Sequence, residues 1–145
     1  MDTFSRKVLF IHAARSNKDP KIIGKVYLDY LTESRILPRR IRMDKGSETK
    51  YVGGIQLDLL EYFGISQIDA EGAMTGPSVD NKIERLWLDY RVKVVDAVKP
   101  ILQRLYETNV YQPDDEVDRD LLAGVFLPYI SRQSEKFKAY HNSHR

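Results

Sequence analysis

The chain has 145 residues, the length of a single domain with one hydrophobic core, and its 42% hydrophobic and 30% charged residues exclude a disordered or collagen-like protein. It has no cysteine, which excludes disulfides and cysteine-based zinc sites, and its longest apolar runs fall well short of the roughly 20 residues of a membrane helix. A net charge of +2 is too small to indicate nucleic-acid binding by itself, so we expect a soluble globular domain whose binding chemistry depends on local charge.

The first expected elements are a strand and a helix. Residues 6–13 form a short apolar run with β-branched and aromatic residues, which predicts a buried strand. Asp19 and Pro20 are typical of a helix N-terminus, and the apolar residues that follow repeat at helical spacing until about Arg35.

A second strand and a second helix are expected next. In residues 39–43, isoleucine and methionine alternate with arginines, which predicts a strand with one buried face that ends at Asp44. Gly46 suits a sharp turn, and Ser47 is expected to cap a helix that runs to Gly64. Alternating strands and helices favour an α/β sheet.

The stretch 65–78 has no clear period. We expect a short strand around Ile68 and then a mobile loop over residues 72–78, which hold two glycines and a proline. Together with the preceding elements, residues 1–78 are expected to form the α/β part of a single domain covering the whole chain.

The remaining residues, 79–145, are expected to be helical. Apolar residues step by three or four over 79–105, which predicts a long amphipathic helix that Pro100 kinks or splits. A last helix is expected from about Glu116, with an interruption at Pro128.

Two carboxylates are candidate metal ligands. Asp44 lies where a predicted strand ends, and Glu84 lies on the first turns of the long helix. Mg²⁺ prefers oxygen ligands, so the pair could share cations that activate an attacking oxygen and stabilise a leaving one. The nearby basic residues suited to phosphate contacts are Arg39, Arg40, Arg42, Lys45, Lys50, Lys82 and Arg85. The alternative is that Asp44 is an ordinary turn residue and Glu84 an ordinary surface charge.

Four segments resemble the catalytic core of DDE-type integrases and transposases, a ribonuclease H-like domain. Residues 39–49, RRIRMDKGSET, resemble the strand that delivers the second catalytic aspartate. Residues 76–91, GPSVDNKIERLWLDYR, resemble the helix of the catalytic glutamate, as written in integrase core-like proteins of eukaryotic mobile elements. Residues 2–13 are similar to the second strand of these cores, and residues 111–145 are similar to their helical extension.

The resemblance implies a catalytic site with three metal-binding carboxylates. Asp44 matches the second and Glu84 the third, whereas Asp2 matches a position that is not catalytic. The first carboxylate belongs on a strand upstream of Met1, so we expect a chain truncated at its N-terminus. With two carboxylates, the site is expected to bind Mg²⁺ or Mn²⁺ weakly and to be inactive or nearly so.

The resemblance also implies a fold, an activity and partners. The expected fold is a ribonuclease H-like core with an incomplete mixed sheet that lacks its first strand and exposes the edge at residues 6–13, and a long C-terminal helical extension. The implied activity is metal-dependent phosphodiester hydrolysis and DNA strand transfer in the nucleus. DNA is the expected partner, through Lys45, Lys82 and Arg85, with neither a membrane nor a small-molecule substrate; homo-oligomerisation stays open. Lys45 departs from the small polar residue that many integrases carry.

Two other functional hypotheses remain. The chain could be a domesticated remnant that binds DNA or protein without catalysis, or a helical interaction domain in which Asp44 and Glu84 are unrelated surface residues. Trp87 is expected to pack in the core and not to stack on bases. His141 and His144 are expected in a frayed polar terminus and not in a metal site.

Overall fold

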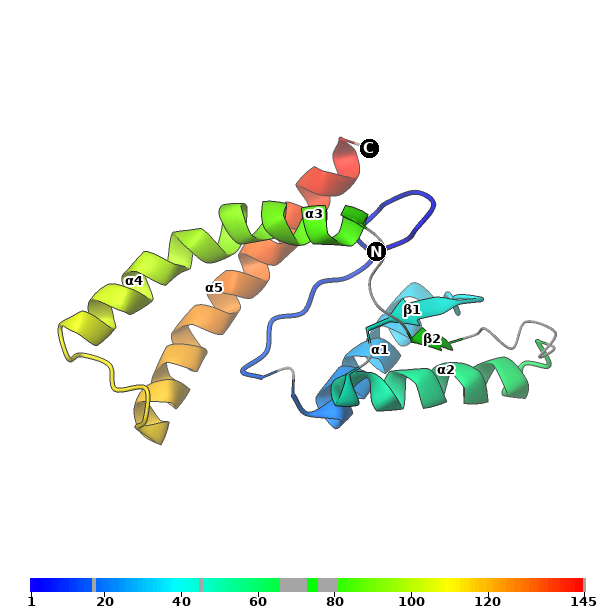
Figure 1. Cartoon of the computed structure of the whole chain (residues 1–145), viewed down its shortest axis with the longest axis horizontal. Helices are drawn as coiled ribbons and strands as arrows, with labels where there is room; N and C mark the ends of the chain where they lie inside the picture. Colours follow the sequence, from blue (N-terminus) through cyan, green and yellow to red (C-terminus); the bar gives the residue numbers. More distant parts are fainter. Residues whose placement is uncertain (17, 45, 66–72, 76–80, 145) are drawn as a thin grey trace. The chain divides into compact units, whose positions relative to one another are not determined.

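The computed structural model describes residues 1–16, 18–44, 46–65, 73–75 and 81–144, and Figure 1 shows it as a ribbon. The chain forms two compact units, one made of Met1–Arg15 with Asp80–Arg145 and the other of Ser16–Val79. We call these the helical unit and the small α/β unit. Their relative placement is not defined, so each is described by itself. In the described part of the chain, no helix is both long and apolar enough to span a membrane.

The small α/β unit begins with helix α1 (Pro20–Ser34). The Asp19 carboxylate accepts a hydrogen bond from the backbone N–H of Lys21 at 2.9 Å, and Pro20 occupies the first helical position. At the other end, Arg35 adopts the left-handed conformation with a φ of 57°. The predicted helix and both of its ends are confirmed.

A parallel pair of three-residue strands follows. Strand β1 (Ile41–Met43) confirms the predicted strand, and it pairs with β2 (Ala73–Thr75) in the register Ile41 to Ala73. The prediction of a loop over 72–78 is wrong at β2, because flanking glycines and a proline masked a very short strand. The strand expected around Ile68 lies outside the described residues.

The fold class is therefore confirmed only in its coarse form, as helices with a small parallel sheet. The sheet of the described residues has two strands, and a ribonuclease H-like core is not seen in them. The predicted long helical C-terminal part is present in the helical unit.

Helix α2 (Lys50–Tyr62) starts differently from the prediction. A 3₁₀ turn, η1 (Ser47–Thr49), precedes it, and Ser47 makes no capping hydrogen bond there, so the predicted serine cap is wrong. The hydroxyl of Thr49 instead donates to the carbonyl of Gly46 at 2.9 Å. The helix end is confirmed, because Gly64 has a φ of 63° and its N–H donates to the carbonyl of Glu61.

A buried polar contact holds α1 and α2 together. The Tyr27 hydroxyl donates to Oε1 of Gln56, and Nε2 of Gln56 donates to the carbonyl of Pro38 at 2.6 Å. Gln56 is completely buried, and Tyr27 is 5% exposed. Because Pro38 stands just before β1, one side chain links both helices to the strand that leads to Asp44. The helices approach closely at Gly24, where a Cβ would lie 3.1 Å from Cβ of Tyr51.

The Tyr27 hydroxyl makes the stability of the small α/β unit depend on pH in the alkaline range. Burial, followed by the neighbouring Tyr30, raises the pKa of Tyr27 to about 12. An unfolded tyrosine has a pKa of about 10, so the folded unit keeps this proton to higher pH. The associated stability is fully present below about pH 10 and is lost as the pH rises towards about 12. We expect the free energy of unfolding in urea to fall less between about pH 10 and about pH 12 for Tyr27→Phe than for the unchanged chain. Equal falls would contradict the assignment of this pH dependence to Tyr27.

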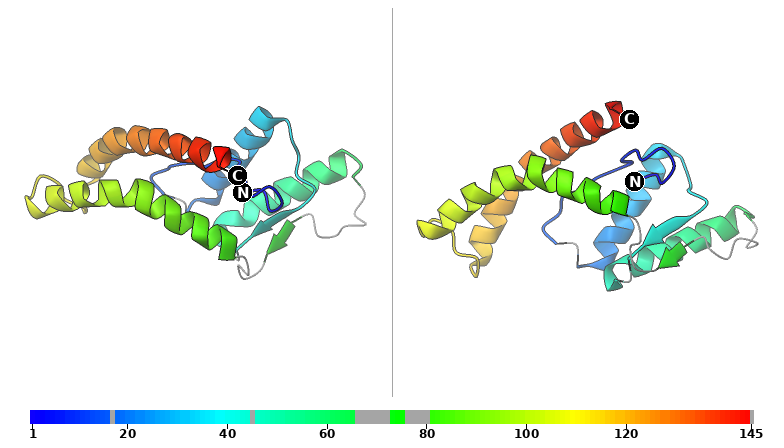
Figure 2. Two further views of the ribbon diagram at one scale, coloured as in Figure 1. Left: turned by 90° about the horizontal axis from the view of Figure 1, so that it is seen from above. Right: turned by 45° about the horizontal axis from the view of Figure 1, so that its top comes forward.

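The helical unit consists of two long helical segments. The first runs through α3 (Asn81–Tyr90), the π-helical turn η2 (Arg91–Val95) and α4 (Asp96–Glu107), and the second is α5 (Glu116–Ser143). Figures 1 and 2 show α5 in orange and red running back beside the green first segment. A left-handed turn at Asn109, with a φ of 55°, ends α4.

Neither proline divides its helix, so the predicted interruption at Pro128 and the predicted split at Pro100 are wrong. Helix α4 continues through Pro100, and the change in helical register comes one turn earlier, at η2. Pro128 lies inside α5, whose 28 residues continue uninterrupted. A proline removes one backbone hydrogen bond, here to the carbonyl of Gly124, and the packing of the rest of the helix outweighs that loss.

The core of the helical unit lies where the two segments and the N-terminal residues meet. Its buried members are Val8, Leu86, Tyr90, Val94 and Phe137. The rings of Tyr90 and Phe137 meet edge to face at 5.4 Å, and the Tyr90 hydroxyl bonds the buried hydroxyl of Ser134 at 2.8 Å. This cluster fixes which face of α3 and α5 points to solvent.

Residues 6–13 do not form the predicted strand. Val8 is buried, but its backbone is held by one side chain: the N–H of Val8 donates to Oδ1 of Asn142 at 2.9 Å, and Nδ2 of Asn142 donates to the Val8 carbonyl at 3.0 Å. An amide side chain thus supplies the donor and acceptor of a neighbouring strand. Residues 6–13 were expected to expose unpaired backbone groups, but at Val8 both backbone groups are hydrogen-bonded. The likeness of residues 2–13 to a strand also fails at Asp2, which accepts the Ser5 N–H at 2.7 Å in a turn.

Candidate active site

Asp44 lies at the carboxyl end of β1, as the sequence predicts. It directly follows Met43, and its side chain is exposed. Its backbone carbonyl accepts hydrogen bonds from the Gly46 N–H at 3.0 Å and the Thr49 hydroxyl at 3.3 Å. The turn therefore fixes the backbone of Asp44 and leaves the carboxylate at the end of a parallel strand, where α/β folds commonly present functional groups.

Glu84 lies in the first turn of α3, again as predicted. Leu86 and Tyr90 on the same helix are buried in the core, whereas Glu84 and Arg85 are exposed. Because the buried face fixes the rotation of α3, the Glu84 carboxylate and the Arg85 guanidinium are both presented to solvent. Hydrophobic periodicity in the sequence was sufficient to place them there.

The two candidate carboxylates lie in different units of the chain. Asp44 belongs to the small α/β unit and Glu84 to the helical unit. Lys45 lies outside the described residues, and Lys82 lies in the first turn of α3 with its side chain outside the description. Among the residues that are described, no group of three histidine, aspartate or glutamate side chains could hold a metal ion.

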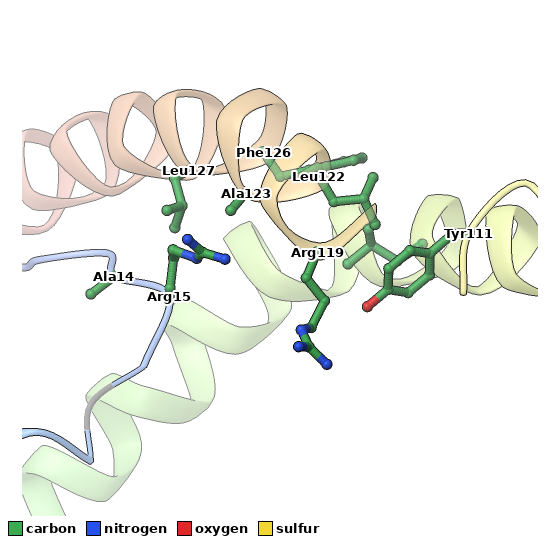
Figure 3. A pocket seen from close by; sticks show the side chains of 9 residues that line it. Ala14, Arg15, Tyr111, Arg119, Leu122, Ala123, Phe126 and Leu127 are labelled. Carbon is green, nitrogen blue, oxygen red and sulfur yellow. The ribbon is translucent and has the colours of Figure 1, made fainter. Parts of the chain in front are cut away.

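The helical unit contains a cavity that the sequence did not indicate. It has a volume of about 470 Å³ and an apolar lining that includes Leu102, Leu122 and Phe126. Figure 3 shows Arg15 and Arg119 beside it. Both guanidinium groups are engaged: Arg15 pairs with Asp120, and Arg119 donates to the carbonyl of Pro113 at 2.9 Å. The cavity contains neither candidate carboxylate, so it is not the predicted catalytic site.

Comparison with known protein families gives a match to the integrase core domain over residues 1–145. The chain belongs to the integrase core family. Searches of curated proteins and of solved structures gave no match. Family membership supports an integrase or transposase type of function, with DNA as the partner of such proteins and divalent metals as their general cofactors. It favours the enzyme and remnant hypotheses over a helical interaction domain.

Trp87 of this integrase core does not pack in the core as predicted. Its side chain is 53% exposed, and its ring meets the edge of Tyr90 at 5.6 Å. The buried stripe runs through Leu86 and Tyr90 of α3 to Val94 of η2, and Trp87 directly follows Leu86 beside it. A tryptophan next to an apolar stripe can cover the rim of a core with one edge of its ring, which periodicity alone does not distinguish from burial.

His141 lies within helix α5 and His144 directly follows its last residue, so the predicted frayed terminus is wrong. Helix α5 extends to Ser143, Nε2 of His141 lies 3.2 Å from the carbonyl of Arg6, and Nδ1 of His144 lies 2.9 Å from that of Tyr140. One ring nitrogen of each histidine is therefore engaged with a backbone carbonyl. The sequence also gave no sign that Lys93 lies over the Tyr140 ring, 4.7 Å from its centroid.

Proposed function

We propose that this integrase core carries a site for metal-dependent phosphodiester hydrolysis and DNA strand transfer, with Asp44 and Glu84 as two of its metal ligands. With two carboxylates instead of three, the activity of this chain is expected to be very low. The observation that carries the proposal is family membership across the whole chain, combined with the exposed carboxylate of Asp44 at the end of a parallel strand. Glu84, exposed on a helix whose other face is buried, supplies the second ligand.

The donor chemistry fits hard divalent cations. Both side chains are carboxylates, and Mg²⁺ or Mn²⁺ prefers such oxygen ligands together with substrate phosphates. When bound, the cations would activate a water or a 3′-hydroxyl and stabilise the leaving oxygen. The residues of the chain hold the ligands: the Gly46 and Thr49 hydrogen bonds position the backbone of Asp44, and the core contacts of α3 orient Glu84. Two carboxylates bind such cations weakly, because the cations hold their own hydration water strongly.

The basic neighbours are proposed to contact the DNA backbone. Arg85 is exposed next to Glu84, and Lys82 lies one turn earlier in the same helix. Lys45 adjoins Asp44 in the sequence. Each phosphate contact adds to the salt dependence of binding without adding sequence preference, so binding through these residues is expected to weaken steeply with salt.

Metal binding tests the assignment of the two ligands directly. We expect Asp44→Asn and Glu84→Gln each to weaken Mn²⁺ binding by about tenfold or more, measured as free Mn²⁺ by electron paramagnetic resonance, since each removes one charged ligand. Asp58→Asn and Glu33→Gln make the same chemical changes at exposed helical positions and serve as controls. Binding by Asp44→Asn and Glu84→Gln equal to that of the controls would exclude this metal site.

A strand-transfer assay separates the enzyme from the remnant hypothesis. The proposed activity requires Mg²⁺ or Mn²⁺ and depends on Asp44 and Glu84. Salt-sensitive DNA binding without metal-dependent cleavage or joining would instead identify a non-catalytic DNA-binding remnant.

A further inference from the structure

The cavity of the helical unit lies outside the buried core of that unit. None of the buried residues in the described core cluster lines it; its walls come from the N-terminal residues, α4, the loop after α4 and α5. Its volume of about 470 Å³ falls within the range of about 300–1,000 Å³ of small-molecule sites. Its large apolar side chains are all only partly buried: Leu102, Leu122, Phe126 and Leu127. A ligand with an apolar part can therefore cover side-chain surface that the packing of the chain leaves open.

Two arginines supply the charged groups of the lining. The Arg15 side chain is 54% exposed and pairs with Asp120, and Nη1 of Arg119 donates to the carbonyl of Pro113 at 2.9 Å. A guanidinium has five N–H donors in a planar fork, so each arginine keeps donors beyond this one contact. In Figure 3 the Arg119 guanidinium and the Tyr111 hydroxyl lie on the side of the cavity away from the apolar side chains of α5.

The surrounding charges favour a small anion over a polyanion. The acidic residues of this region lie at the start of α5 and just before it, and none of them lines the cavity: Asp114, Asp115, Glu116, Asp118 and Asp120. Asp115 caps α5, Asp118 accepts the Gln112 N–H at 2.9 Å, and Asp120 pairs with Arg15. These carboxylates repel a nucleic-acid backbone, which carries many charges. A single carboxylate needs only the direct hydrogen bonds of one or two guanidinium groups.

We propose that this cavity binds a small monocarboxylate with an apolar chain, of the short fatty-acid type. The chain of the ligand lies against the leucines and Phe126, and its carboxylate accepts hydrogen bonds from Arg15 and Arg119. The site is separate from the proposed metal site, because neither Asp44 nor Glu84 lines it. Binding of the ligand therefore needs no divalent cation.

Calorimetric titration of the whole chain tests the class of ligand. Octanoate is expected to bind with a dissociation constant below about 1 mM in the absence of divalent metal. Octanol has the same chain without the charge and should bind about tenfold more weakly, since it loses the charge-assisted hydrogen bonds. Acetate has the charge without the chain and should show no measurable binding. Octanoate without measurable binding at millimolar concentration, or octanol as tight as octanoate, would overturn the proposal.

Substitutions in the lining test the location of the ligand. Arg15→Gln and Arg119→Gln are each expected to weaken octanoate binding about tenfold, whereas Arg132→Gln, an exposed change on α5, should not. Ala123→Phe fills the cavity and should abolish binding, and Ala139→Phe makes the same change at an exposed position of α5. Circular dichroism shows whether each variant keeps its helices. Octanoate binding by the three lining variants equal to that of the two controls would show that the cavity is not the site.

Discussion

Replacing Phe137 by alanine is expected to lower the free energy of unfolding of the helical unit by about 3–5 kcal/mol, the usual cost of truncating a buried phenylalanine. Phe137 is 5% exposed and belongs to the cluster that joins α5 to α3, η2 and the N-terminal residues. Its ring meets the edge of Tyr90 at 5.4 Å and stacks on His141 at 5.9 Å. The substitution therefore removes apolar contacts from several elements at once and leaves a cavity at their centre.

Urea unfolding measured by tryptophan fluorescence reports this loss. Trp87 is the only tryptophan of the chain and lies on α3 beside Tyr90, so its emission follows the helical unit. Phe4→Ala is the matched control, because Phe4 is 97% exposed and its truncation should change the stability very little. If Phe137→Ala and Phe4→Ala unfold at the same urea concentration, α5 is not held by this cluster.

Local sequence signals predicted the starts of α1 and α5 well. Asp19 caps α1 and Asp115 caps α5, each through hydrogen bonds from backbone N–H groups two or three residues further along, so all the information lies within one turn. Asp44 and Glu84 were placed by the same kind of information, a short alternating strand and a helical stripe. Nearby residues were sufficient for these features.

The failed predictions depend on distant residues. Val8 has its backbone partner in Asn142, 134 positions away, so no local pattern could distinguish this segment from a strand of a sheet. The positions of Pro100 and Pro128 inside helices depend on the packing of whole helices against a core, which outweighs the local preference to break. Trp87 shows the same limit, since its burial depends on where the other helix passes and not on its own spacing.

Replacing Gln56 by leucine is expected to destabilise the small α/β unit by about 2–4 kcal/mol. Leucine has a similar size but no polar atoms, so the Tyr27 hydroxyl and the Pro38 carbonyl lose their partner in a buried place, and each unsatisfied group costs about 1–3 kcal/mol. Gln56→Glu should also destabilise, because a carboxylate can accept from Tyr27 but cannot donate to the carbonyl of Pro38.

Amide hydrogen exchange measured by mass spectrometry localises this effect, which Trp87 in the other unit cannot report. Exchange is expected to accelerate about tenfold or more in α1 and α2 and to stay unchanged in α5, because opening of one unit need not open the other. Gln103→Leu, an exposed change on α4, is the control. Since Gln56 also anchors the chain just before β1, the same substitution should weaken Mn²⁺ binding through Asp44. Unchanged exchange in α1 and α2 would mean that apolar contacts such as Val52 and Leu60 hold the unit without the polar link.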